Sequence, residues 1–307
     1  MEERGAPEDR PGVPDDLAVI QAAVLAWYDR ERRDLPFRRT HDPYLILVSE
    51  AMAQQTQIDR AATAWTSFVE RFPTVETLAV APLGDVLRAW AGLGYNRRAV
   101  HLQRAARAIV ADHGGVVPDE PAVLETLPGV GPYTARAVAA IAFGRPVGAV
   151  DTNVRRVLPR LVGRELTASA TQRLADAFVP PNRAADWTAA LMDIGSRHCR
   201  PRPKCDGCPV RAHCPSASTS GGEARMRERR RPARQPVVRP FESTSRWLRG
   251  RIVATLRAAL ADGWHRFDGP IGGHDAAAVN RALCALVKDG LVELHEADPT
   301  TARLAPG

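Results

Sequence analysis

Apolar residues recur at helical spacing along most of the chain up to Cys199. The spacing predicts amphipathic helices joined by short connections rich in Gly, Pro and Asp. One helix is expected to begin at Asp42-Pro43, because Asp can cap a helix and Pro is tolerated in its first turn. The other expected helices cover residues 17–31, 58–71, 82–90, 97–112, 121–125, 133–143, 153–161, 170–178 and 186–196.

The pattern changes after residue 214. No earlier segment alternates strongly between apolar and polar residues, so the main body is predicted to be all-α. Residues 215–243 lack apolar periodicity and are interpreted as a basic linker. From residue 244 we expect a helix to residue 262, a second helix over 275–289 and a β-prone run over 291–294, an order compatible with a small winged-helix-like module.

The composition excludes a membrane protein. The chain has 307 residues, 45% of them hydrophobic and 25% charged, and its apolar runs fall short of the roughly 20 residues that cross a bilayer. The acidic, Pro-rich leader over 1–16 has no apolar segment and does not look like a secretory signal. We therefore expect a cytoplasmic protein, in which five cysteines are more typical of ligands than of disulfides.

The positive charge is concentrated in two places. The net charge of +7 equals the excess within 223–251, which holds ten arginines and three acids. This segment is predicted to supply salt-dependent, nonspecific affinity for an anionic partner. A second basic group lies within 197–214, among four cysteines.

Those four cysteines, Cys199, Cys205, Cys208 and Cys214, form a C-x5-C-x2-C-x5-C pattern that is typical of a metal site. Four thiolates can hold either a structural zinc or an iron-sulfur cubane, and the spacing leaves both alternatives open. Cys284 stands apart on an apolar helical pattern and is predicted to lie in the core.

A Gly-x-Gly turn at Gly129 and Gly131 precedes a predicted helix, and Gly92-Leu93-Gly94-Tyr95 repeats the arrangement. Glycines allow a tight turn whose amides point outward at a helix N-terminus, which is a phosphate site without side-chain charge. A plain turn is the alternative.

Two acids stand out by their surroundings. Glu50 lies in the apolar run 45–53, with Gln54 one turn later, and is either solvent-facing or buried as a proton donor. Asp151 follows the apolar run 147–150 and precedes a helix, as a helix cap does, and a carboxylate there stays ionised. One acid that holds a proton and one that stays charged are the pair that cleavage of a glycosidic bond requires.

In this order the motifs resemble the helix-hairpin-helix, endonuclease III-like DNA glycosylases, and among them the MutY-type adenine glycosylases in a short form. The motifs are LPFR, DPYLILVSEAMAQQTQ, FPTVETLA, WAGLGYNRRA, LPGVGPYTARAV and VDTNVRRV, followed by the cysteines. The resemblance implies a two-lobed fold: an iron-sulfur cluster domain (17–38 and 144–214) and a six-helix domain with the hairpin (39–143).

The resemblance also implies roles for individual residues. Glu50 would protonate the flipped adenine opposite 8-oxoguanine or guanine, Asp151 would stabilise the sugar cation, and Asn153 would help hold the active site. The four cysteines would bind a 4Fe-4S cluster. The residues expected to contact DNA or the bases are Arg38, Gln54, Gln55, Thr56, Tyr95, Gly129, Gly131 and Tyr133. The partner would be double-stranded DNA carrying a mismatch or an oxidised base, bound by a monomer.

The scarcity of lysine predicts an enzyme that does not nick the strand. Lys204 and Lys288 are the two lysines of the chain, and Tyr133 stands where lyase members carry Lys. Strand cleavage proceeds through a Schiff base on an amine. We therefore expect a monofunctional glycosylase that leaves an abasic site.

The chain departs from the family pattern at several positions. Phe37 stands where Trp is usual and Ala53 where Leu is usual, so the base pocket is expected to be wider. The first cysteine gap is one residue short, and the tail is too short for a Nudix-like domain. Phe37 and Ala53 keep open a first alternative, a thymine or uracil mismatch glycosylase acting opposite guanine. A second alternative is a noncatalytic, redox-sensing DNA-binding protein.

Overall fold

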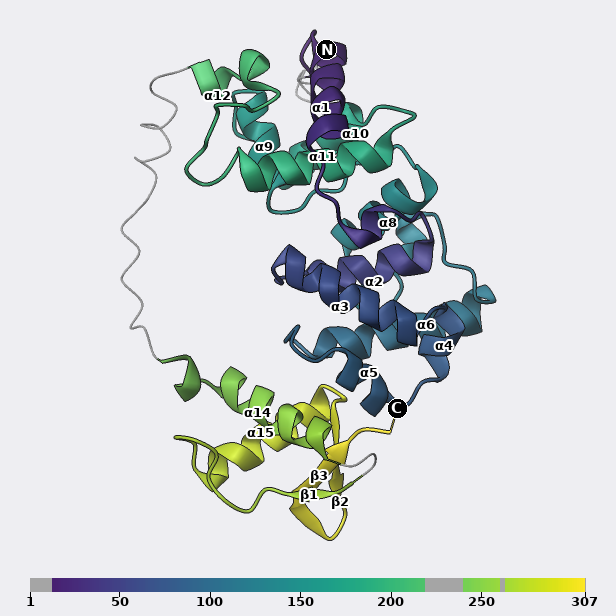
Figure 1. Ribbon diagram of the computed structural model, residues 1–307, viewed down its shortest axis with the longest axis vertical. Coiled ribbons are helices and arrows are strands. Elements are labelled where there is room, and N and C mark those ends of the chain that lie inside the picture. The colour runs from purple at the N-terminus through teal and green to yellow at the C-terminus, as the bar shows by residue number, and fades with distance from the viewer. Residues whose placement is uncertain (1–12, 219–239, 260–262, 307) are drawn as a thin grey trace, which may run out of the picture. The chain divides into compact units, whose positions relative to one another are not determined.

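The computed structural model describes residues 13–218, 240–259 and 263–306 (Figure 1). The chain forms two compact units. Among the described residues, the cysteine unit comprises 13–46, 119–125 and 131–218, and the hairpin unit comprises 47–118, 126–130, 240–259 and 263–306. None of the described helices is both long and apolar enough to cross a membrane.

The cysteine unit is built around helix α11 (Ala184–Arg197), which packs against α1 (Leu17–Glu31), α8 (Pro132–Phe143) and α9 (Val154–Leu161). The buried side chains of Trp187 and Phe178 fill the middle of this bundle. Its remaining helical elements are η1 (Pro36–Arg38), α7 (Pro121–Leu124), α10 (Ala168–Phe178), η2 (Arg211–His213) and α12 (Pro215–Ser218).

The hairpin unit contains most of α2 (Pro43–Ala53) and a group of helices around Trp90 and Phe68, whose rings meet edge to face. Buried Gln103 of α6 donates to the carbonyl oxygens of Leu78 and Ala81 and so fastens α6 to α4 and the residue that follows α4. The helices are α3 (Ile58–Arg71), α4 (Val75–Val80), α5 (Leu83–Ala89) and α6 (Arg97–His113).

The C-terminal module, residues 240–306, belongs to the hairpin unit. Helices α14 (Ser245–Ala258) and α15 (Ala276–Lys288) pack together and cover a small antiparallel sheet of order β1-β3-β2 (Figure 1). The other elements are η3 (Phe241–Ser243), β1 (His265–Arg266), β2 (Val292–His295) and β3 (Asp298–Leu304). Thr244 and Asp275 cap the two helices by accepting hydrogen bonds from backbone amides.

The predicted helices of the body are confirmed, with ends that differ by no more than two residues. Helix α4 was not predicted, because it is only six residues long and its start is marked by a capping box of Thr74 and Thr77 in place of the more familiar Ser/Thr with Glu. The strand β2 is confirmed, whereas β1 and β3 were not predicted.

Two interpretations of the tail are corrected. Cys284 is exposed, because the buried face of α15 is formed by Val279, Ala282, Leu283 and Leu286 and the residue next to Leu283 points about 100° away. The predicted linker 215–243 is too long, since residues 215–218 form α12 and residues 241–243 form η3. Of the arginines in the basic segment 223–251, Arg246, Arg249 and Arg251 lie on folded α14. The residues 219–239 of that linker, and 1–12 of the leader, lie outside the described residues.

The compact units divide the body differently from the predicted domains. Helix α8 and residues 119–125 group with the cysteine unit, and the hairpin residues 126–130 group with α3–α6. The reason is packing: α8 contacts α11 and α7, and its side chains Ala135, Ala137 and Val138 are completely buried.

Candidate active site

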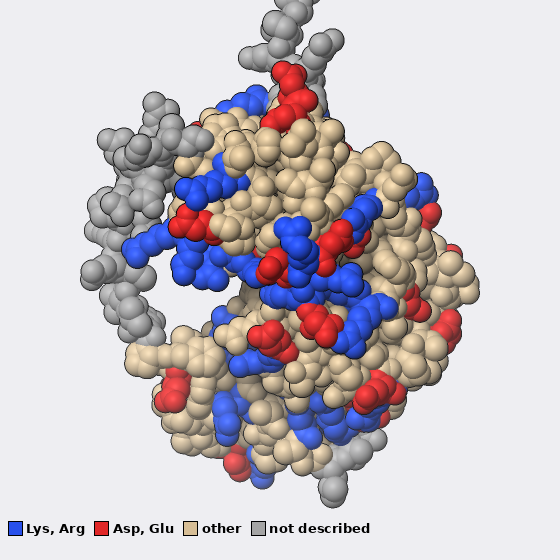
Figure 2. Space-filling model, turned by 45° about the horizontal axis from the view of Figure 1, so that its top comes forward, with Lys and Arg blue, Asp and Glu red and all other residues tan. Residues whose placement is uncertain are grey.

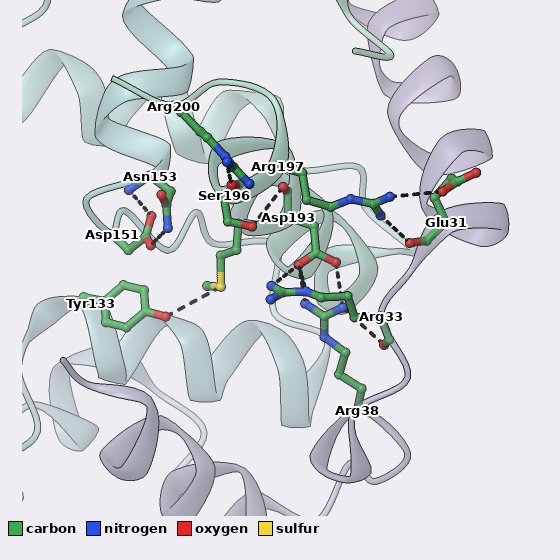
Figure 3. A network of polar contacts seen from close by, with 11 residues as sticks. Glu31, Arg33, Arg38, Tyr133, Asp151, Asn153, Asp193, Ser196, Arg197 and Arg200 are labelled. Carbon is green, nitrogen blue, oxygen red and sulfur yellow. Dashed lines mark hydrogen bonds and ion pairs between the residues drawn. The ribbon is translucent and has the colours of Figure 1, made fainter. Parts of the chain in front are cut away.

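Asp151 is held at the start of α9 by three hydrogen bonds, two of them from Asn153 (Figure 3). Its Oδ1 accepts from the backbone amides of Asn153 at 2.8 Å and Val154 at 2.7 Å, and its Oδ2 accepts from Asn153 Nδ2 at 2.8 Å. Backbone amides at a helix N-terminus lack partners within the helix, and the Asp151 carboxyl group supplies one. The helix-cap prediction is therefore confirmed, and the hydrogen bonds fix the orientation of the carboxyl group.

Asn153 is itself held from behind by Arg156. Its Oδ1 accepts from Arg156 Nη2 at 2.7 Å, and Arg156 also donates to the carbonyl oxygens of Gly195, at 2.7 Å, and Cys199. A Cβ on Gly195 would lie 2.4 Å from Asn153 Cβ, so α11 approaches this closely only because residue 195 is glycine. Asp151, Asn153 and the start of the cysteine loop thus form one connected polar network.

The cysteine loop, residues 199–214, packs on the core of its unit through Cys199, Cys208 and Cys214. Arg160 Nη1 lies 3.2 Å from Cys199 Sγ and also donates to the Arg200 carbonyl oxygen. Burial raises the pKa of Cys208 to about 11, with a further contribution from the other three cysteines.

The donor chemistry of the loop fits an iron-sulfur cluster: four half-buried thiols with a guanidinium beside one of them. As the side chains stand, no group of three or more His, Cys, Asp or Glu residues in the described part of the chain could hold a metal ion.

Arg38 lies in a second network of the same unit, centred on Asp193 of α11 (Figure 3). The Asp193 side chain is completely buried and pairs with both Arg38, at 2.7 Å, and Arg33. Burial alone would raise the pKa of Asp193, but hydrogen bonds and charge from Arg38 and Arg33 outweigh it, and the pKa is lowered. The structure gives Arg38 a structural partner, and its predicted contact with DNA stays a prediction.

Replacing Asp193 by Asn is expected to lower the free energy of unfolding by about 2 to 3 kcal/mol, because two arginines would lose their buried counter-charge. The pKa of Asp193 is lower in the folded protein than in the unfolded chain. The stability that ionised Asp193 contributes is therefore fully present above the ordinary aspartate pKa, and it is lost as the pH falls through the lowered pKa of the folded protein. Urea unfolding at neutral and acidic pH measures both effects.

The exposed Asp34–Arg39 pair serves as the control, since both side chains are more than two-thirds exposed. Asp34→Asn should barely move the urea midpoint. An equal loss in both variants would contradict the assignment of Asp193 as a buried anchor.

The hairpin turn requires glycine at one of its two predicted positions. Gly129 has a φ of +80°, and a Cβ there would lie 2.5 Å from His101 Cβ on α6. Gly131 has an extended backbone and open space at its Cβ position, and it precedes α8 directly. Burial, and then the charges of Arg97 and Arg104, lower the pKa of His101, so the imidazole beneath Gly129 is neutral at pH 7.

Gln55 and Tyr95 share an uncommon backbone conformation, with φ of 53° and 45°. One half-buried arginine, Arg98, connects their two loops. Its Nη1 donates to the carbonyl oxygens of Ala51 and Met52, and its Nη2 donates to Thr56 Oγ1 and to the carbonyl oxygens of Leu93 and Gly94.

The Arg98 guanidinium also lies over the rings of Trp90 and Tyr95. Burial lowers its pKa, although an arginine remains charged. Three predicted DNA-contacting residues, Gln55, Thr56 and Tyr95, are thus brought together by a residue that was not predicted. The sequence feature that could have pointed to Arg98 is the pair of arginines that directly follows Gly-Tyr-Asn.

Glu50 lies on α2 in the hairpin unit and is buried, with 9% of its surface exposed. The solvent-facing alternative is therefore wrong. Gln54, one turn further, is half-buried. In the cysteine unit, half-buried Tyr133 donates from its hydroxyl to Met192 Sδ at 3.8 Å (Figure 3).

Arginine side chains gather into patches on the face drawn in Figure 2, with acids interspersed among them. Such a surface suits a polyanion better than a small neutral ligand.

The family comparison matches residues 48–181 to the HhH-GPD superfamily of base excision DNA repair proteins. The chain is 40% identical to an adenine DNA glycosylase of Mycolicibacterium smegmatis, over 90% of this chain and 94% of that protein. Among solved structures, a thermostable thymine-DNA glycosylase is 32% identical with a TM-score of 0.62, over 66% of this chain and 96% of the other.

An endonuclease III bound to DNA superposes with a TM-score of 0.56 at 23% identity, over 69% of this chain and 98% of the other, which shows the shared fold. The predicted mostly helical glycosylase fold is thereby confirmed. With this identity and coverage, the chain belongs to the adenine DNA glycosylase family of the HhH-GPD superfamily.

Proposed function

We propose that the protein is a base-excision-repair glycosylase that hydrolyses the N-glycosidic bond of adenine mispaired with 8-oxoguanine or guanine. The observation that carries this proposal is the contrast between two carboxyl groups: Glu50 is buried, and Asp151 is capped by three donors. Family membership supplies the base, adenine.

The two groups have complementary roles in the cleavage. As the general acid, buried Glu50 donates a proton to a ring nitrogen of the adenine and makes the base a better leaving group. The sugar then develops positive charge, which the fixed carboxylate of Asp151 stabilises until water attacks. The nucleotide leaves the base stack first, because neither group reaches the bond inside a duplex.

The product is an abasic site in an unbroken strand. Tyr133 replaces the amine that a Schiff base needs, and its hydroxyl is directed to Met192. Strand breaks that appear only after alkali are the expected result. Breaks without alkali or added amine would contradict the monofunctional assignment.

The cysteine loop holds a 4Fe-4S cluster in this proposal, through Cys199, Cys205, Cys208 and Cys214. The cluster, when bound, cross-links the loop. Lys204 and the arginines of the loop then lie on a fixed backbone from which they contact DNA phosphates.

Metal analysis of the purified protein is expected to find four irons and four acid-labile sulfides per chain. Cys205→Ser should lose most of the iron, because one of the four thiolate ligands is removed. Cys284→Ser, at an exposed cysteine of α15, is the matched control and should retain it. Stoichiometric zinc instead of iron would contradict the cluster assignment.

A panel of duplexes tests the substrate: adenine opposite 8-oxoguanine, adenine opposite guanine, and thymine or uracil opposite guanine. We expect alkali-labile sites with the two adenine duplexes. Release of thymine or uracil alone would favour the second candidate, which the 32% identity to a thymine-DNA glycosylase supports. No release from any duplex would favour a noncatalytic DNA-binding protein.

A further inference from the structure

The C-terminal module is packed on helices α5 and α6 of its unit. Helix α14 contacts α5, and the Leu83 backbone amide at the start of α5 lies 3.4 Å from the carbonyl oxygen of Pro306. Arg257 Nη2, from α14, donates to Asn96 Oδ1 at 2.8 Å. Asn96 directly follows Tyr95, so the module contacts the loop that carries this residue.

A shared carboxylate strengthens the same contact. Asp289, at the end of α15, pairs with Arg249 of α14 and lies 3.8 Å from Arg97 of α6. Next to it, Gly290 approaches α6 so closely that a Cβ would lie 2.7 Å from Arg104 Nη2. Contacts from two helices of the module therefore converge on the N-terminal half of α6.

Arg246, in the first turn of α14, reaches Tyr95 itself. Its guanidinium carbon lies 4.0 Å from the centroid of the Tyr95 ring, while the Arg98 guanidinium lies 5.7 Å from the same centroid. Tyr95 is 42% exposed although two guanidinium groups lie over its ring. The side chain is thus oriented by cations and still accessible to a ligand.

The end of α14 that carries Arg246 is itself fixed. Thr244 caps the helix, and the ring of Trp247 stacks on His274 and covers Gly272, where a Cβ would lie 2.7 Å from the indole. The exposed Arg246 guanidinium, on this fixed helix end, presents positive charge next to Tyr95.

We propose that Arg246 is a positioning residue for the DNA strand opposite the excised adenine: it orients Tyr95 against the opposite base and contacts a phosphate of that strand. The C-terminal module is then part of the DNA-binding surface. This inference rests on the proposed function in one respect: the family resemblance implies that Tyr95 contacts the base opposite the adenine. Phosphate is the chemistry that an exposed guanidinium with a free edge recognises.

The test compares full-length, cluster-containing Arg246→Ala and Arg246→Lys with wild type. Binding is measured over a range of salt concentrations to duplexes carrying a reduced abasic site opposite 8-oxoguanine or guanine, which no glycosylase can process. Arg246→Ala should weaken binding about three- to five-fold and reduce the slope of log affinity against log salt by about one. Arg246→Lys retains the charge and should restore the slope.

Two controls separate a DNA contact from a merely structural role. Arg281→Ala removes an exposed arginine from α15 and should leave affinity and slope unchanged. In a double-mutant cycle, Arg246→Ala combined with Tyr95→Ala should weaken binding less than the sum of the single variants, because the two side chains act together.

An unchanged salt slope in Arg246→Ala, or additive effects in the cycle, would overturn the inference. The proposed function has a separate test, because the binding duplexes require no base release. A wild-type protein that releases no adenine overturns the proposed function alone, whereas adenine release with normal binding by Arg246→Ala overturns this inference alone.

Discussion

Asp151→Asn is expected to lower the single-turnover rate of adenine release by about 10²- to 10³-fold, because the charge that stabilises the sugar cation is removed. The amide oxygen can still accept from the backbone amides of Asn153 and Val154. The variant therefore preserves the helix cap and removes the charge. The hydrogen bond from Asn153 Nδ2 would be lost, because the new NH2 group and Asn153 Nδ2 are both donors, unless the Asn153 amide turns over.

Single-turnover kinetics with excess enzyme measure this effect without interference from product release. Asp275→Asn is the matched control, since Asp275 caps α15 through the Ala278 amide and lies outside the proposed active site. It should react at the wild-type rate. A similar fall in both variants would mean that helix capping, and not the charge at residue 151, supports the reaction.

Glu50→Gln is expected to lower the same rate by about 10²- to 10⁴-fold, the usual contribution of a positioned general acid. The substitution keeps the size and polarity of a buried side chain and removes the proton that it donates. The wild-type rate should fall as the pH rises, because only the protonated acid is active, and this fall should be absent from Glu50→Gln.

Rate profiles of wild type and Glu50→Gln across the pH range test the assignment. Glu70→Gln changes an exposed carboxyl group on α3 and should keep both the rate and the profile of the wild type. If Glu50→Gln reacts more slowly but keeps the wild-type pH profile, another group is the proton donor and Glu50 acts only through packing.

Helical periodicity predicts the body of this fold well, because most helices bury one stripe of side chains and two of them end at a capping glycine. Gly114 and Gly144, both left-handed, end α6 and α8 in this way. Short elements are harder to predict: α4 and β1 have too few residues to show a period, and β3 is recognisable only once β1 and β2 lie beside it.

Residues that are specified by local motifs were found from the sequence, whereas residues that act through distant contacts were not. Asp151 is a cap that its neighbours define, but the pairing of Asp193 with Arg33 and Arg38 spans about 160 positions. Arg98 donates a hydrogen bond to the carbonyl oxygen of Met52, 46 residues earlier in the chain. The burial of Glu50 could not be predicted, since an acid in an apolar helix has two orientations and only the packed helices decide between them.

The docked module also bears on how this protein can change over evolutionary time. Asn96 with Arg257, and Arg97 with Asp289, join positions more than 150 residues apart. A substitution on one side of such a pair removes one of the contacts that dock the module, so the two sides are expected to change together. A tail transplanted from a distant relative would therefore dock poorly unless the matching residues on α6 came with it.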